Sequence, residues 1–307
     1  MAREQAGICA EGNLHGQYLL FDCVEGQEHA IRAQLSEVSH YLDEMTELYS
    51  DVAFSAFIAV GANYWDALYP DSRPALLRPF PSLTHGDRHA PACPFDLFIQ
   101  IRCDRQDINY MVSHEICLMF EDLANLVEEL KSFRYLDNRD LTGFVDGTEN
   151  PKGLHRQEVA LVSDDDKEFR GGSYIHIQRY QHDLKKWNNL KVKKQEDIIG
   201  RTKQENHEYS SFNKPKTSHI RRTSLKDNQG KSLEILRQSM PYGDMKEQGL
   251  FFISCCHTPL NFELMLRSMI VGDNNGHYDH LLKYTQAVTG AAFFAPSMSF
   301  LNKKAHQ

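Results

Sequence analysis

The sequence predicts an α+β protein in which antiparallel sheets are covered by helices. Short segments rich in apolar residues, typical of strands, are separated by longer segments with apolar residues at helical spacing. A strand-like segment followed by a helix-like segment occurs in both halves of the chain, at 95–103 and again at 249–256. The 307 residues are many for one simple core and suit one large domain or two fused units. We therefore expect an internal duplication.

Strand and helix patterns alternate along the first half of the chain. In the segment 95–103, apolar residues occupy every second position and share one face. In the segment 28–49, apolar residues recur every three or four positions, as on one helix face. The expected elements are a strand at 17–22, a helix at 28–49, a strand at 52–60, a short helix or turn from 65, a long Pro- and Gly-rich loop at 72–94, a strand at 95–103 and a helix from 104 to about 130.

The second half repeats this order loosely. Gly171 and Gly172 lead into an alternating strand at 173–180, which a helix through Leu184 and Trp187 follows. A further strand is expected at 249–256 and an apolar-rich helix at 260–270. We pair the segment 56–65 with 173–180, and the strand and helix from 95 with the strand and helix from 249. Two such units give antiparallel sheets covered by helices.

Composition and charge exclude several functional classes. The net charge of −8 argues against a general nucleic-acid-binding protein. No apolar run is long enough to cross a membrane, and we find no basic-then-apolar leader at the N-terminus. The seven cysteines match no zinc-binding spacing, and we expect them to be buried thiols in a reducing compartment. These features predict a cytoplasmic globular protein that binds neither membranes nor nucleic acids.

Positive charge is concentrated in one region. Residues 185–231 contain thirteen Lys or Arg and five Asp or Glu, although the chain as a whole is acidic. A local positive excess favours an anionic ligand. The alternative is a solvated loop with no ligand.

The segment 141–151, with the sequence LTGFVDGTENP, is the most unusual stretch of the chain. Gly143 and Gly147 permit backbone angles that other residues avoid. An Asp on such a loop, here Asp146 beside Phe144 and Val145, is placed to have its ionisation adjusted by its surroundings. The simpler interpretation is a tight turn in which Asp146 caps the backbone.

Three further residues are candidates for chemistry. His219 lies in the basic region, and imidazole is a common ligand of iron and zinc. Arg237 lies among apolar residues before a Pro-Tyr-Gly turn, so it should be partly buried with a charged or polar partner. Asp279 opens a helical stretch, where N-capping is its simplest role. A hydrolase that uses Asp146 and His219 stays open, although no nucleophile has a recognisable context.

Taken together, the motifs resemble the dye-decolourising peroxidase family, specifically its bacterial B-type branch. Their order and spacing match that branch from about residue 5 to residue 300. The loop, the TSH segment and the RQSMPYG segment in this order are the most specific part. The matching segments are GFVDGTENP at 143–151, GGSYIHIQRY at 171–180, IGRTK at 199–203, KTSHI at 216–220, RQSMPYG at 237–243 and DHLLKYTQAVTGAAFFAPS at 279–297.

The resemblance implies a duplicated ferredoxin-like fold, with halves at 1–140 and 141–307 and haem b, iron protoporphyrin IX, in the second half. His219 matches the proximal iron ligand, and Asp279 matches the carboxylate that hydrogen-bonds to it. Asp146 and Arg237 match the distal pair, of which we expect Arg237 to matter more. Ser239 falls where some relatives carry Asn, so we include it among the catalytic residues only by position. The remaining expected cofactor contacts are Arg201, which matches a residue at a haem propionate, and Gly147, Thr148 and Gln178.

The expected function is therefore a haem peroxidase that reduces hydrogen peroxide and oxidises dyes or phenolic donors. The alternative is a haem-binding or haem-handling protein with only incidental peroxidase activity. Intact Asp146 and Arg237 favour the enzyme, because a carrier needs neither. The buried aromatic residues Trp187, Tyr174, Tyr180 and Tyr242 could relay electrons, although packing is the simpler role. As for partners, we expect peroxide, a small reducing substrate and further copies of the chain in a homo-oligomer.

Overall fold

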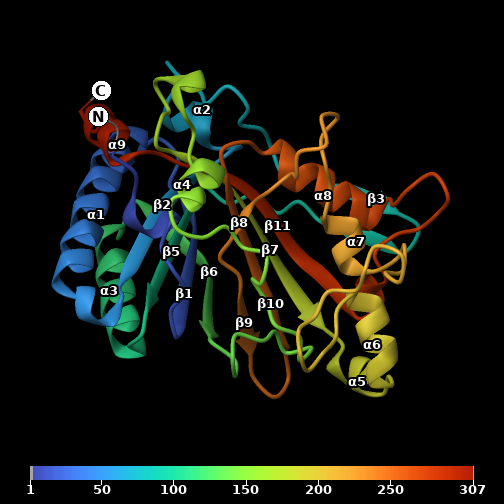
Figure 1. Cartoon of the computed structure of the whole chain (residues 1–307). Coiled ribbons are helices and arrows are strands. Elements are labelled where there is room, and N and C mark those ends of the chain that lie inside the picture. Colours follow the sequence, from blue (N-terminus) through green and yellow to red (C-terminus); the bar gives the residue numbers. More distant parts are fainter. Residues whose placement is uncertain (1–2, 307) are drawn as a thin grey trace.

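The computed structural model describes residues 3–306 (Figure 1). Most of its strands belong to one nine-stranded sheet in which every paired strand is antiparallel to its neighbour. The first half of the chain contributes four strands and the second half contributes five. They are β1 (His15–Cys23), β2 (Ser55–Gly61), β5 (Leu97–Cys103), β6 (Ala124–Phe133), β7 (Ser173–His182), β8 (Leu236–Arg237), β9 (Met240–Gly243), β10 (Gln248–Cys256) and β11 (Thr285–Ala295).

The strand order confirms the duplicated ferredoxin-like fold. In the first half the neighbours run β6-β1-β5-β2, and in the second half they run β11-β7-β10-β9. With β8 and β9, which both pair with β10, counted as one interrupted strand, numbering within each half gives the order 4-1-3-2 in both, and α1 and α3 in the first half connect strands as α8 does in the second. The predicted α+β class is therefore correct.

The two predicted sheets are joined at both edges. β11 pairs with β2 at Phe293↔Gly61, and β6 pairs with β9 at Ser132↔Tyr242. Because β7 also pairs with β10, the strands close into a ring. This closure removes the exposed edges that two separate sheets would leave.

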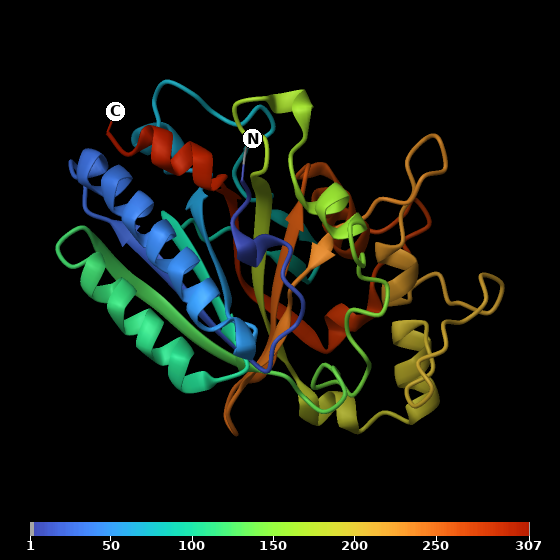
Figure 2. The same ribbon diagram turned by 60° about the vertical axis from the view of Figure 1, so that its left-hand side comes forward.

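Helices cover the outer faces of this ring (Figure 1). Figure 2 shows α1 and α3 side by side on the sheet of the first half, whereas α5, α6, α7 and α8 lie on the side of the second half. The helices are α1 (Glu28–Leu48), α2 (Trp65–Leu68), α3 (Gln106–Met119), α4 (His155–Ala160), α5 (Leu184–Asn188), α6 (Val192–Ile199), α7 (His219–Thr223), α8 (Leu260–Ile270) and α9 (Met298–Lys304). No helix within residues 3–306 has the length and apolar character needed to span a membrane.

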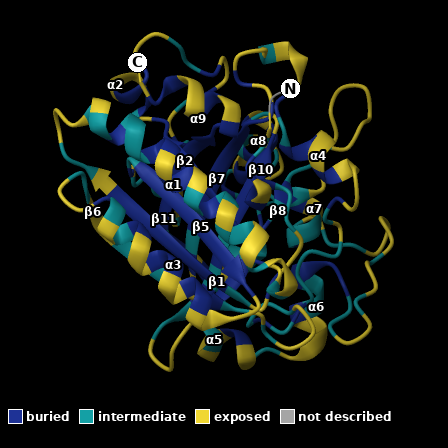
Figure 3. Cartoon of the chain, turned by 90° about the vertical axis from the view of Figure 1, so that its left-hand side faces the viewer, coloured by how far each residue is buried: buried dark blue, intermediate teal, exposed yellow. Residues whose placement is uncertain are grey.

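Alternation along the strands divides the apolar core into two main clusters. On β5, Leu97, Ile99 and Ile101 belong to the cluster beneath the helices, whereas Phe98 belongs to the cluster inside the ring. Figure 3 shows that the strands are buried and that the outward surfaces of α1 and α3 are exposed. The next inward positions on β5, Gln100 and Arg102, are polar yet buried.

Three sequence predictions are wrong. The helix expected to reach residue 130 ends at Met119, and Ala124–Phe133 forms β6, because pairing with β1 outweighs the helix-forming residues of that segment. The helical stretch expected after Asp279 is present as a short 3₁₀ helix, His280–Lys283, which β11 follows. The loop expected at 72–94 contains the hairpin β3 (Leu83–His85) and β4 (Arg88–Ala90). Finally, β7 corresponds to β1 and not to the segment 56–65.

Candidate functional site

A cavity of about 420 Å³ lies within the second half of the chain. Its walls are largely apolar, and a few polar side chains converge on it, which is the usual character of a cofactor or substrate pocket. Apolar contributions come from α8, from β10 and from the loop 141–151. Of the predicted site residues, all but one line this cavity: Asp146, Gly147, Thr148, Gln178, Arg201, His219, Arg237 and Ser239.

Asp279 is the exception, and it lies directly behind His219. The Nδ1 atom of His219 donates to the Oδ2 atom of Asp279 at 2.6 Å, and Asp279 is fully buried. The other carboxylate oxygen accepts from the backbone N–H of Leu281 at 2.9 Å. Asp279 therefore caps the 3₁₀ turn and also hydrogen-bonds to the imidazole of His219.

The backbone around these two residues is fixed from both sides. His219 is the first residue of α7, which Ser218 caps by accepting from the N–H of Arg221. The N–H of His280 donates to the carbonyl of Thr217 at 3.0 Å, and the N–H of Asp279 donates to Met269. With Nδ1 engaged, Nε2 is the ring nitrogen of His219 that remains for a ligand in the cavity.

Asp146 and Arg237 form a looser pair in the same cavity. Their closest atoms, Oδ1 of Asp146 and Nη1 of Arg237, are 3.6 Å apart, and each side chain is more than a quarter exposed. This distance permits Coulomb attraction but is too long for a good hydrogen bond. The Oδ1 atom of Asp146 accepts from the N–H of Gly147 at 2.7 Å, and Gly147 has φ +74°. Both charged heads remain available to a small molecule between them.

Asn150 anchors this pair, and the sequence interpretation gave it no role. Its Nδ2 atom donates to the carbonyl of Arg237 at 2.7 Å, and its Oδ1 atom accepts from the N–H of Arg237 at 2.8 Å. This reciprocal bond joins the loop of Asp146 to the strand of Arg237. The available signal was the position of Asn150 in the ENP end of the loop motif, where an amide can pair with backbone in both directions.

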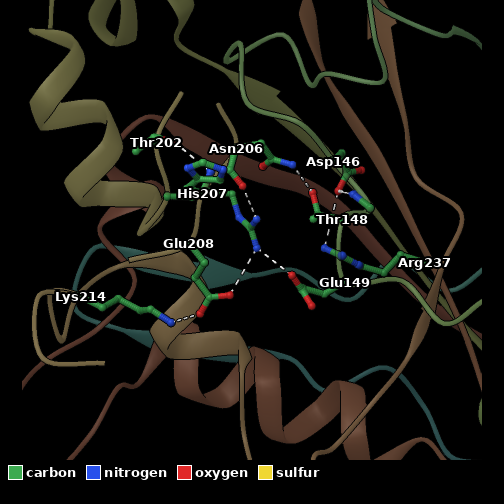
Figure 4. Close-up of polar contacts among 11 residues, drawn as sticks. Asp146, Thr148, Glu149, Thr202, Asn206, His207, Glu208, Lys214 and Arg237 are labelled. Atoms are coloured by element: carbon green, nitrogen blue, oxygen red, sulfur yellow. Dashed lines mark hydrogen bonds and ion pairs between the residues drawn. The ribbon is translucent and has the colours of Figure 1, made fainter. Parts of the chain in front are cut away.

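Arg201 lines the cavity but already has two carboxylate partners. Glu149 and Glu208, both labelled in Figure 4, accept from its Nη2 atom at 2.9 and 3.3 Å. Lys214 pairs with Glu208 on the far side. Two of the basic residues in 185–231, Arg201 and Lys214, are thus paired with carboxylates. The sequence did not indicate these two glutamates as neighbours of Arg201.

The remaining predicted residues differ in their hydrogen bonding. Gln178 is buried, accepts from the hydroxyl of Tyr180 at 2.9 Å, and has no partner for its Nε2 atom among the described residues. Thr148 accepts from Asn206 at 2.9 Å (Figure 4). The Oγ atom of Ser239 accepts from the N–H of Ile253 at 3.3 Å, which leaves its proton free to donate.

The aromatic residues considered as relays are all buried: Tyr174, Tyr180, Tyr242 and Trp187. Tyr174, Tyr242 and Trp187 belong to apolar clusters, whereas Tyr180 lines the cavity. Burial and the nearby Asp279 raise the pKa of Tyr180 well above its ordinary value. Trp187 donates to the carbonyl of Thr142 at 2.8 Å and contacts Phe144 edge-on, so this ring has a packing role.

The fold and the cavity define an enzyme-like pocket with a carboxylate-bound His and a separate Asp–Arg pair. The family model described as "Dyp-type peroxidase, N-terminal" matches residues 5–134. The family model described as "Dyp-type peroxidase, C-terminal" matches residues 137–300. The chain belongs to the Dyp-type peroxidase family. The predicted family and the predicted class of enzyme, a peroxidase, are therefore confirmed.

Individual relatives agree over nearly the whole chain. A dye-decolorizing peroxidase of Rhodococcus erythropolis is 37% identical over 93% of this chain and 84% of its own length. A putative dyp-type peroxidase from Shewanella oneidensis is similar in structure, with a TM-score of 0.98, 61% identity and coverage of 99% of both chains. A DypB variant from Rhodococcus jostii RHA1 in complex with heme gives a TM-score of 0.91 and 35% identity, covering 95% of this chain and 96% of that one.

Proposed function

We propose that this chain is a haem-dependent peroxidase that reduces hydrogen peroxide and oxidises dyes or phenolic donors. The observation that carries the proposal is one cavity lined both by His219, which Asp279 holds from behind, and by the Asp146–Arg237 pair. The rival function, haem handling with incidental peroxidase activity, requires only the first pair. The family relationship and the haem complex of the Rhodococcus jostii relative support haem b as the cofactor.

The residues of the cavity fit a haem group. A haem needs apolar walls for its ring and an unprotonated imidazole nitrogen for its iron. Phe252, Phe262 and Met265 are among the apolar residues of the cavity, and His219 has Nε2 available. The unpartnered Nε2 atom of Gln178 is a buried donor that a bound group would satisfy. When bound, haem supplies a redox-active iron at which peroxide can be reduced.

His219 is the proposed iron ligand, and Asp279 is the residue that orients it. A carboxylate on Nδ1 fixes the tautomer with Nε2 unprotonated and makes the imidazole a stronger electron donor. The full burial of Asp279 excludes water, which would otherwise compete for the Nδ1 proton. The 2.6 Å contact thus supports a ligand with one orientation.

Asp146 and Arg237 are the proposed catalytic residues on peroxide. Cleavage of the O–O bond requires a proton to move from one peroxide oxygen to the other, so that the second oxygen leaves as water. The Asp146 carboxylate can accept and return that proton, directly or through a water molecule. The Arg237 guanidinium can stabilise negative charge on the leaving oxygen. The hydroxyl of Ser239 can donate a further hydrogen bond there.

Arg201 is proposed to contact a haem propionate, with Gly147, Thr148 and Gln178 as the other haem contacts. A propionate is an anion that a guanidinium binds well. In the structure, Glu149 accepts a hydrogen bond from this guanidinium, and the side chain of Glu149 is 68% exposed. An exposed carboxylate can turn outward into water at little cost, so Arg201 can exchange Glu149 for a propionate.

The visible spectrum before and after one equivalent of hydrogen peroxide tests the proposal. We expect the purified chain to show a ferric-haem Soret band that changes within the mixing time of a stopped-flow instrument and returns when a phenolic donor is added. Slow bleaching without recovery would favour the haem-handling function. Absence of a Soret band after reconstitution with haem would contradict both functions.

The domain boundary and the assembly remain predictions. We propose that the halves are 1–140 and 141–307, that copies of the chain form a homo-oligomer, and that the protein is cytoplasmic. Size-exclusion chromatography with light scattering measures the assembly directly. A single species with the mass of one chain would contradict self-association.

A further inference from the structure

A second cavity, of about 220 Å³, adjoins the first. Asp146, Gly147, Arg237 and Ser239 line both cavities, so the two share a wall. The other walls of the second cavity come from the N-terminal segment and from residues that follow β6. Arg102, at the end of β5, also lines it.

Arg102 is a buried cation without a counterion. Its residue is only 4% exposed, and it forms no ion pair among the described residues. Its one hydrogen bond runs from Nη1 to the Oε1 atom of Gln238 at 3.2 Å, and its Nε atom has no partner. Gln100 donates to the same Oε1 atom at 2.5 Å, so Gln238 offers Arg102 a shared, neutral acceptor. Buried charges in proteins are normally paired because desolvation is costly.

The other charged side chains of the cavity do not supply the missing counterion, because most of them are also basic. Six basic and two acidic side chains line the second cavity; the basic ones are Arg102, Arg134, Arg139, Lys152, Arg156 and Arg237, and the acidic ones are Glu11 and Asp146. The two acids are already engaged, because Asp146 faces Arg237 and Glu11 lies 3.4 Å from Arg156. Burial first, and then the charge of Arg156, lowers the pKa of Arg102.

Of the neighbouring cations, three have other partners, and the remaining two, Arg134 and Lys152, are exposed to solvent. Arg102 is therefore the cation of this cavity that is buried without a counterion. Arg139 pairs with Asp137 and donates to the carbonyls of Gly143 and Lys203. Arg156 donates to the carbonyls of Cys9, Ala10 and Pro151. A ligand in this cavity would therefore gain most from the guanidinium of Arg102.

We propose that the second cavity binds a small oxyanion, held by Arg102. An oxygen anion can accept two hydrogen bonds from one guanidinium, which matches the free donors of Arg102. The volume of about 220 Å³ admits a group such as phosphate or a short carboxylate. This site is separate from the proposed haem pocket, because neither Arg102 nor Gly12 lines the first cavity.

Gly12 provides a specific way to test the site. A Cβ atom added at Gly12 would lie 3.9 Å from the Nη2 atom of Arg102 and meets nothing closer. Gly12 is not among the glycines with positive φ, so a side chain there causes no backbone strain. Gly12→Asp would place a carboxylate of the chain itself beside Arg102, and Gly12→Asn is the matched neutral control.

The experiment is calorimetric titration of the haem-loaded full chain with inorganic phosphate, and separately with acetate, at constant ionic strength set with choline chloride. We expect saturable binding of at least one of the two, with one site per chain. Saturation by phosphate alone would assign a tetrahedral oxyanion, and by acetate alone a carboxylate. Gly12→Asp should weaken binding at least tenfold, and Gly12→Asn should change it less than twofold.

Two results would overturn the proposal. One is the absence of saturable binding of both anions to the wild-type chain. The other is equal binding by the wild-type and Gly12→Asp chains, which would place the anion elsewhere. Arg102→Gln, which removes the charge, should also abolish binding. If Arg102→Gln does not fold, the Gly12 pair still decides the outcome, because Gly12 lies on the surface.

Discussion

The two polar pairs at the large cavity, His219–Asp279 and Asp146–Arg237, differ in how tightly they are held. His219 and Asp279 are 2.6 Å apart, and the carboxylate is fully buried. Asp146 and Arg237 are 3.6 Å apart, and both are partly exposed to the cavity. The first pair is fixed by the backbone on both sides, whereas the second depends on the two hydrogen bonds of Asn150.

This difference indicates how one cavity can assign cofactor binding and proton transfer to separate pairs of residues. A ligand to a cofactor benefits from a single orientation, which burial and a short hydrogen bond provide. Groups that move protons and respond to developing charge need partners that can be exchanged, which a longer and more exposed pair permits. We therefore expect changes at the first pair to act mainly on haem binding, and changes at the second to act mainly on the reaction with peroxide.

The largest expected effect comes from the tight pair. His219→Ala should weaken haem binding by more than about 100-fold, because even second-sphere partners of a ligand contribute about 10–100-fold. The ratio of Soret to 280 nm absorbance after haem titration measures this loss. Full haem retention with an unchanged spectrum would contradict the assignment of His219.

At the loose pair, Asp146→Asn should lower the second-order rate constant for peroxide by about 100-fold, at the low end for a general acid–base residue. The amide keeps the size of the side chain but cannot accept the proton. Stopped-flow absorbance at the Soret band gives the rate. Haem affinity serves as the control, and a parallel loss of affinity would mean that the two pairs are not separate.

Asp279→Asn tests the orienting role without removing the cap. Asn also caps turns well, so the bond from Leu281 should persist. We expect haem affinity to fall by about 10–100-fold and the iron reduction potential to rise, because the imidazole becomes a weaker donor. Spectroelectrochemical titration measures the potential. An unchanged potential would show that Asp279 acts only as a cap.

The smallest effect is expected for Asn150→Ala. Losing both bonds to the backbone of Arg237 should cost about 1–3 kcal/mol of stability. The less fixed guanidinium should also raise the activation barrier by about 1.4 kcal/mol, which lowers the peroxide rate constant about tenfold. Denaturant unfolding and stopped-flow absorbance measure the two changes. Lost stability with an unaltered rate would make Asn150 purely structural.

The sequence was a better guide to the residues that line the cavity than to the pairing of the strands. Asp146, His219, Arg237 and Asp279 each lie in a short motif that the sequence displays directly, and the structure brings them to one cavity region. Asn150 and Glu208 were missed because their partners lie 87 and 7 residues away and form no pattern.

Tertiary pairing explains the errors in the fold. The strand at 95–103 was recognisable because its apolar residues alternate. β6 was not, since most of its side chains are exposed or half-buried and only its pairing with β1 makes it a strand. The joining of the two sheets depends on a few edge residues, such as Ser132 and Tyr242, whose sequence carries no sign of it.

The most direct test is Arg237→Leu, assayed for haem affinity and for peroxide reaction in the same preparation. We predict haem affinity within about twofold of wild type and a peroxide rate constant lower by about 10²–10³, as for the loss of one charge-stabilising donor. A rate constant close to that of wild type would contradict the proposed role of Arg237. Loss of haem together with the rate would contradict the division of the cavity into a binding pair and a reacting pair.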